Sequence, residues 1–102
     1  MSSFETQVDR NLMGKRLEKE GKVLKAKALY EANISEDFQG SFPYRRLAIL
    51  YRKRKSIEEE IRVLEKAVSV FQSLNGTGRE DIHPKLIEFQ ERLEKAKLLK
   101  SK

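Results

Sequence analysis

The sequence predicts an all-α fold of about five helices, arranged as stacked antiparallel hairpins. Apolar residues recur at three- and four-residue steps through most of the chain, which is typical of amphipathic helices. No segment shows the strict alternation of apolar and polar residues that is typical of a strand. The sequence also echoes itself with a period of 34 residues. Such a period is typical of helical hairpins that bury their apolar faces against one another.

The 34-residue echo aligns residues of similar size and polarity. It pairs Met13 with Leu47, Gly14 with Ala48, Leu17 with Tyr51, Val23 with Ile57, Tyr30 with Leu64, and Ile34 with Val68. At 102 residues, the chain has the common size of one domain with one core. We therefore expect a single domain over residues 1–102.

Two helices are expected in the first hairpin. Apolar residues lie one turn apart over about residues 5–20, and Gly21 then provides a break. A second helix over about residues 22–36 again has one apolar face. The segment that follows, residues 37–41, contains a glycine and is typical of a turn.

Two more helices are expected in the second hairpin. Pro43 suits the first turn of a helix, where its missing N–H costs no hydrogen bond, so we expect a third helix over about residues 43–54. Ser56 is expected to cap a fourth helix with its side chain. The apolar stripe of this fourth helix, over residues 57–74, is broad enough for a helix with neighbours on two sides.

The chain after residue 74 departs from the 34-residue register. Residues 75–83 are polar and include two glycines, which is typical of a loop. Pro84 is expected to open a fifth helix, whose apolar face would cap the second hairpin. On the polar face of that helix, Glu88 and Arg92 have the spacing of a favourable ion pair.

The composition argues against an enzyme. The chain contains no cysteine and a single histidine, His83, which leaves no His-based triad, no pair of histidines for zinc and no Cys nucleophile. Residues 75–79 resemble a phosphate-binding loop only by their glycines and lack the Gly-Lys-Ser/Thr ending. We therefore expect no catalytic residue, no metal site and no cofactor.

Membrane segments are not expected either. No apolar run approaches the roughly 18 residues of a membrane span, and the N-terminus lacks the apolar stretch of a signal peptide. The absence of cysteine fits the reducing environment of the cytoplasm. We therefore expect a soluble, cytoplasmic protein that does not contact membranes.

Residues 47–68 resemble a tetratricopeptide repeat. The positions that match the family pattern outright are Leu47, Ala48, Tyr51 and Ala67, while Tyr44 and Leu64 match it in character. The first copy fits at Gly14, Ala26 and Tyr30. In this pattern small residues let two helices approach closely and large residues fill the groove between them.

Three residues depart from the family pattern. Arg10 stands where a large aromatic residue is usual, and Asn33 stands where alanine is usual. In the second copy, Glu60 replaces a small residue that packs against the preceding helix. Because an unpaired buried carboxylate is costly, Glu60 must either turn outward or find a basic partner.

The resemblance implies a short right-handed superhelix. It places the first repeat at residues 7–40, the second at residues 41–74, and a loop with a capping helix at residues 75–102. It also implies a concave groove lined by the first helix of each hairpin, where members of the family hold their binding residues.

The groove that the resemblance implies is basic around one apolar residue. Its expected lining is Asn11, Lys15 and Lys19 from the first helix, and Arg45, Arg46, Ile49, Arg52 and Lys53 from the third. Arginine presents a donor fork that suits carboxylates and phosphates. This lining favours a non-enzymatic protein-interaction module or small adaptor that binds an acidic peptide or protein segment.

Several alternatives stay open. The 22 Lys and Arg residues, against 16 Asp and Glu, give a net charge of +6 that could serve solubility alone or nucleic acid. Nucleic acid is less favoured, because no helix-turn-helix or RNP-like motif is present and glutamates interrupt the basic run. The fifth helix, with Glu88, Glu91 and Glu94, could instead fill the groove. Two repeats are few for a stable array, so a homodimer is a further alternative.

Overall fold

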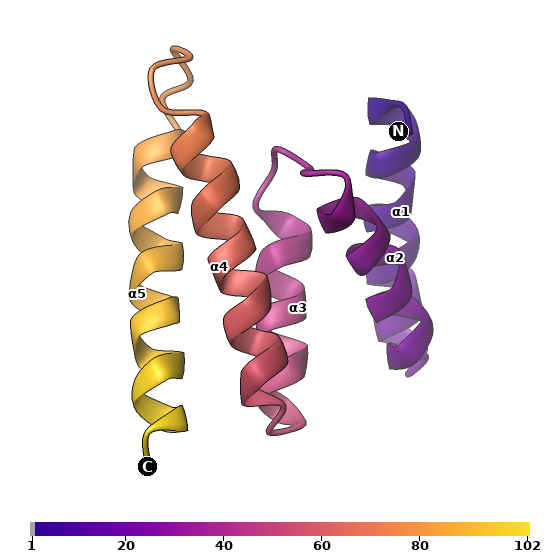
Figure 1. Ribbon diagram of the computed structural model, residues 1–102. Coiled ribbons are helices and arrows are strands. Elements are labelled where there is room, and N and C mark those ends of the chain that lie inside the picture. Colours follow the sequence, from indigo (N-terminus) through magenta and orange to yellow (C-terminus); the bar gives the residue numbers. More distant parts are fainter. Residues whose placement is uncertain (1) are drawn as a thin grey trace. The chain divides into compact units, whose positions relative to one another are not determined.

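The computed structural model describes residues 2–102 as five α-helices (Figure 1). They are α1 (Phe4–Lys19), α2 (Val23–Ser35), α3 (Phe42–Lys53), α4 (Ile57–Ser73) and α5 (Ile82–Lys100). The described residues contain no strand, so the prediction of an all-α fold with about five helices is confirmed. Within residues 2–102, no helix combines the length and apolarity that crossing a membrane requires.

The turn inside each hairpin repeats at the 34-residue spacing. α1 ends at Lys19 and α3 at Lys53, while α2 begins at Val23 and α4 at Ile57. In the first turn, the amide of residue 22 donates to the carbonyl of residue 17 at 2.8 Å. Residues 56 and 51 make the same bond at 2.9 Å. The 34-residue repeat is therefore present in the backbone of these two turns.

Each of these turns places one residue in the left-handed conformation. Gly21 has φ of 78° and Lys55, 34 positions later, has φ of 59°. Their amides donate to the carbonyls of Glu18 and Arg52 at 3.0 and 2.9 Å. Glycine adopts this conformation freely, whereas a residue with a Cβ pays for it.

The predicted side-chain cap at Ser56 is wrong. Ser56 holds the N-cap position of α4, but its side chain makes no cap hydrogen bond. Its φ and ψ of −87° and 69° nearly match the −92° and 64° of Lys22, the equivalent residue before α2. This turn departs from the extended conformation that directs a cap side chain to the next turn. Ser3, which is extended, does cap α1 by accepting from the Thr6 amide at 3.2 Å.

α5 begins two residues before the predicted Pro84. Its first residue, Ile82, is buried. The helix therefore begins ahead of Pro84, at a residue that belongs to the core. The predicted ion pair between Glu88 and Arg92 on the same helix forms at 2.8 Å.

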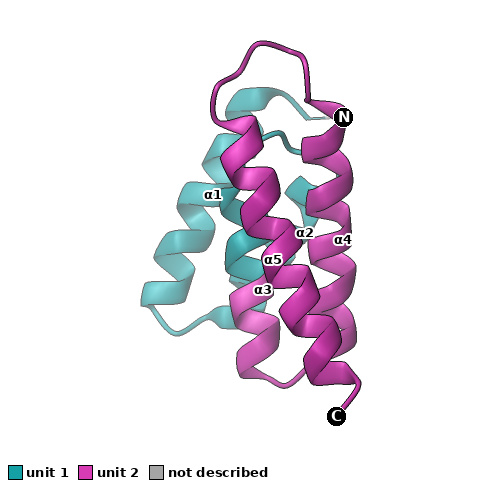
Figure 2. Ribbon diagram, turned by 90° about the vertical axis from the view of Figure 1, so that its left-hand side faces the viewer, with its two compact units in different colours: residues 1–47 teal, residues 48–102 magenta. Residues whose placement is uncertain are grey.

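The structure groups residues 1–47 into one compact unit and residues 48–102 into a second, with the boundary inside α3 (Figure 2). Unit 1 contains the α1–α2 hairpin and the first half of α3. Unit 2 contains the second half of α3 with the antiparallel pair α4 and α5, which lie side by side in Figure 1. The single domain expected over residues 1–102 stays a prediction.

Unit 1 combines an aromatic core with buried polar contacts. The fully buried ring of Tyr30 meets Phe42 edge to face, with centroids 5.7 Å apart. Asn33 is fully buried too, and its amide donates to the carbonyl of Gln7 at 2.7 Å and to Asn11 Oδ1 at 2.9 Å. These hydrogen bonds satisfy the polar atoms of the buried Asn33 side chain, as burial requires.

Arg10 completes this polar cluster. Its guanidinium donates to Asn33 Oδ1 at 3.1 Å and to Glu36 Oε1 at 2.9 Å. The hydrogen bonds from Arg10 lower the pKa of Glu36 from its ordinary value of 4.5 to about 2, and bonds from Gln7 and Ser2 act in the same direction. Glu36 is therefore held as a carboxylate at neutral pH.

Unit 2 has its core along α4 and α5. Phe71 and Phe89, both fully buried, pack with their ring centroids 5.6 Å apart. Val63, Leu64 and Ala67 are also fully buried and extend this core along α4. The broad apolar stripe predicted for the fourth helix is thus mostly buried.

We predict opposite effects of glycine at the two equivalent turns. Lys55→Gly should raise the free energy of unfolding by about 0.5–1 kcal/mol, because it relieves the left-handed strain. Gly21→Ala should lower it by about 1 kcal/mol for the reverse reason. No atom lies within 4 Å of an added Cβ at residue 21, so sterics do not confuse the comparison. Urea unfolding followed by circular dichroism measures both, and a loss of stability in Lys55→Gly would contradict the argument.

We predict that Glu36 contributes an acid-dependent part of the stability. Its carboxylate has a lower pKa in the folded chain than its ordinary 4.5, so its contribution is complete above pH 4.5 and is lost as the pH falls towards 2. Glu36→Gln should be less stable than wild type at pH 7, and the difference should shrink over that window. Thermal unfolding at several pH values tests this, and a constant difference from pH 7 to 2 would contradict it.

Candidate binding site

The eight residues predicted to line the groove separate into three sets. Lys15, Lys19 and Arg46 line one pocket within unit 1. Ile49, Arg52 and Lys53 line another within unit 2. Asn11 and Arg45 are half-buried, and the side-chain oxygen of Asn11 already accepts a hydrogen bond from Asn33.

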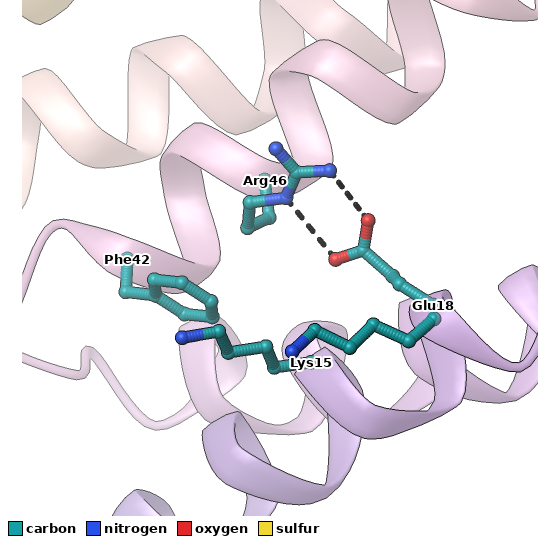
Figure 3. Close-up of a pocket in the computed structure, with 5 residues that line it drawn as sticks. Lys15, Glu18, Phe42 and Arg46 are labelled. Carbon is teal, nitrogen blue, oxygen red and sulfur yellow. Dashed lines mark hydrogen bonds and ion pairs between the residues drawn. The ribbon is translucent and has the colours of Figure 1, made fainter.

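The pocket in unit 1, here called the α1–α3 pocket, is lined by Lys15, Glu18, Lys19, Phe42 and Arg46 (Figure 3). α1 supplies the first three residues from about one helical turn. Phe42 and Arg46 come from α3 and lie four positions apart, so they share one face of that helix. The pocket has a volume of about 270 Å³.

Glu18 organises the α1–α3 pocket. The Arg46 guanidinium donates two hydrogen bonds to its carboxylate, from Nε to Oε2 at 3.1 Å and from the Nη2 group to Oε1 (Figure 3). The hydroxyl of Tyr30 also donates to Oε2, at 2.7 Å. Such a two-point pair fixes the position and plane of the guanidinium. Arg46 is therefore oriented before any ligand arrives.

The protonation states in this network are also fixed. Glu18 raises the pKa of Arg46 above its ordinary value, so the guanidinium stays charged. Burial raises the pKa of Tyr30, and the nearby Glu18 carboxylate raises it further. The Tyr30 hydroxyl therefore remains a neutral donor at physiological pH.

Lys15 and Lys19 give the α1–α3 pocket its charge. Both side chains are exposed, and neither ammonium group forms an ion pair with any other of residues 2–102. Three cations face one carboxylate in the pocket, which leaves a net charge of +2. The charges of Lys15 and Lys19 are therefore available to a ligand.

Glu18 and Phe42 line this pocket although neither is among the eight residues predicted for the groove. Phe42 is the apolar one of the two. It is half-buried and forms an apolar wall beside the charged groups. Its position four residues before Arg46, on the same helix face, is the signal that could have identified it.

The pocket in unit 2 also contains an arginine that is paired with a carboxylate, and here the carboxylate is buried. Arg52 Nη2 contacts Glu60 Oε2 at 2.7 Å, and Arg52 Nε donates to Oε1 at 3.2 Å. The Glu60 side chain is only 3 % exposed. The expectation that Glu60 turns outward or finds a basic partner is confirmed by this pair. Arg52 thereby compensates a buried charge.

Arg52 also lines two pockets that contain both acidic and basic side chains. One pocket of about 230 Å³ joins it to Ile49, Lys53, Glu60 and Arg92. Another of about 310 Å³ is lined by Arg52 and by Glu88, Glu91, Arg92 and Lys95 of α5. Carboxylates from α4 and α5 thus accompany the cations, which makes unit 2 the weaker place for an anionic ligand.

Metal-binding groups are not gathered in the described part of the chain. Residues 2–102 contain no cluster of three or more His, Cys, Asp or Glu side chains placed to hold a metal ion. His83 is exposed beside Pro84 at the start of α5.

Comparison with known proteins found no matching family model, curated protein or solved structure. The resemblance to tetratricopeptide repeats therefore depends on the residues that carry it and stays a prediction.

We predict that Arg52 is needed for stability because Glu60 is buried. Arg52→Leu should lower the free energy of unfolding by about 2–3 kcal/mol, since it leaves a buried carboxylate unpaired. The double variant Arg52→Leu/Glu60→Leu should recover most of that loss, because it removes the orphaned charge. Chemical unfolding of wild type, both single variants and the double variant forms a complete cycle. Additive losses from the two single variants would show that the pair is not coupled.

Proposed function

We propose that this chain is a non-enzymatic protein-binding module of the tetratricopeptide-like kind, which holds a carboxylate of an acidic segment in its α1–α3 pocket. The observation that carries the proposal is the pair of lysines, Lys15 and Lys19, exposed and without ion-pair partners beside an arginine that Glu18 holds in place. The groove expected from the sequence contains all three of these cations.

The arrangement favours binding of an anion in two ways. The ammonium groups of Lys15 and Lys19 attract a carboxylate without first breaking an internal ion pair. Arg46 is already ordered by Glu18, so less side-chain entropy is lost on binding than for a freely rotating arginine. The ring of Phe42 gives the alkyl part of an incoming side chain an apolar surface.

The binding site that we propose is smaller than the groove predicted from the sequence. Arg52 is engaged with Glu60, and glutamates of α5 line the pocket beside it. We therefore assign ligand binding to unit 1 and a mainly stabilising role to Arg52. This assignment leaves Ile49 and Lys53 as secondary contacts at most.

The proposal predicts that an acidic peptide binds through Lys15 and Lys19. A fluorescein-labelled peptide rich in glutamate would be titrated at 50 and 150 mM salt and followed by fluorescence anisotropy. We expect Lys15→Glu/Lys19→Glu to weaken binding at least tenfold. The control Lys25→Glu/Lys97→Glu changes the net charge equally at two exposed lysines outside the α1–α3 pocket and should change the Kd less than twofold.

Two results would contradict this function. Equal loss in both double variants would show that the peptide responds to net charge and not to the pocket. Tighter binding of a single-stranded oligonucleotide than of the peptide, abolished by the same pocket variant, would favour the nucleic-acid alternative instead.

A further inference from the structure

One face of α1 is exposed and carries unpartnered apolar and charged side chains. Leu12 and Met13 are 61 % and 44 % exposed. Asp9 stands three residues before this apolar pair and Arg16 three residues after it, and both are exposed. Neither Asp9 nor Arg16 forms an ion pair within the described part of the chain. With about 100° between successive residues, all four lie on one side of the helix.

This face, here called the α1 outer face, is distinct from the face by which α1 packs in its own unit. Gln7 and Gly14 are the buried residues of α1, and they lie on the opposite side of the helix. Leu12 and Met13 together form a small apolar patch on this exposed side.

The charges of the α1 outer face are antisymmetric about its apolar centre. Reversing the direction of the helix exchanges Leu12 with Met13 and places Asp9 where Arg16 stood. Two copies placed antiparallel therefore bring Asp9 opposite Arg16, whereas two parallel copies would oppose Asp9 to Asp9. Glu5 and Glu20 lie on the same side of α1 and face each other at the ends of the antiparallel pair, where Glu20 is already paired with Lys22 at 3.4 Å. A two-fold axis imposes this reciprocity, because each contact occurs twice.

We propose that the α1 outer face binds the same face of a second copy of this chain. In this antiparallel pair Leu12 packs against Met13 of the partner subunit. Asp9 pairs with Arg16 of the partner subunit, and symmetry makes the same pair again at the other end. The protein itself is thus the partner that this surface fits, and the proposal does not depend on the ligand of the α1–α3 pocket.

The small area of the α1 outer face limits the affinity expected for the dimer. Four side chains on one helix bury less than the roughly 800 Å² per partner of a standard interface. We therefore expect a weak dimer, with a Kd of about 10–100 µM, that dissociates on dilution.

Sedimentation velocity of the full chain at about 5–500 µM tests the proposal. Wild type should shift from monomer to dimer over this range, and Leu12→Ser/Met13→Ser should stay monomeric. Leu24→Ser is the matched control, because Leu24 is 70 % exposed on α2 and outside the α1 outer face. It should dimerise like wild type, and circular dichroism should show every variant to be helical.

Charge-reversal variants test whether the partner of this face is a second copy of the chain. Asp9→Arg alone and Arg16→Asp alone should each weaken self-association at least tenfold, because each puts like charges opposite one another. An equimolar mixture of these two variants should associate again, since one then supplies only arginine and the other only aspartate at these positions.

Introduced cysteines give the orientation, because the chain has none of its own. Met13→Cys should form a disulfide-linked dimer under mild oxidation, since residue 13 lies beside the two-fold axis. Glu5→Cys should not, because antiparallel pairing separates the two copies of residue 5 by about 22 Å along the helix. A monomer at every concentration, a mixture that fails to associate, or equal crosslinking of both cysteines would each overturn the proposal.

Discussion

The ring of Tyr30 lies against the backbone of α1 because residue 14 has no side chain. A Cβ added at Gly14 would stand 2.4 Å from Tyr30 Cε1, closer than packed atoms approach. The close approach lets the Tyr30 hydroxyl reach Glu18, which in turn holds Arg46. The same ring packs edge to face on Phe42. Tyr30 thus contacts two of the five residues that line the α1–α3 pocket, Glu18 and Phe42, and positions a third, Arg46, through Glu18. The glycine that admits its ring lies outside the pocket.

Each departure from the repeat pattern has acquired a polar partner. Arg10 and Asn33, both unusual in the first copy, are hydrogen-bonded to each other at 3.1 Å. Glu60, unusual in the second copy, is paired with Arg52. Burying any of these groups alone would cost several kcal/mol, at roughly the scale of one unsatisfied polar or charged side chain. The departures therefore substitute specific hydrogen bonds for apolar packing, and they add directionality at points where the family pattern relies on shape.

The backbone was more predictable than the site. Periodicity and Gly21 located the first helices and their turn to within about two residues, because apolar spacing and left-handed turns have local causes. The sequence predicted that Glu60 either turns outward or finds a basic partner. It did not predict that the partner is Arg52, since pairing depends on packing between helices. Phe42 was missed for a similar reason. A ring that covers the core on one side and borders a pocket on the other has the sequence signature of a core residue alone.

The buried hydroxyl groups of Tyr30 and Tyr44 also make the stability of the fold decrease at alkaline pH. Burial is the main cause that raises the pKa of both Tyr30 and Tyr44 above the ordinary 10.0, and the hydroxyl of Tyr44 donates to the Phe38 carbonyl at 2.7 Å. Above pH 10, an unfolded chain releases protons from these hydroxyls that the folded chain retains. The balance between the two states then shifts towards the unfolded chain as the pH rises. Base thus weakens the packing around Tyr30 from inside, while acid acts through the carboxylate of Glu36 at the edge of the same unit.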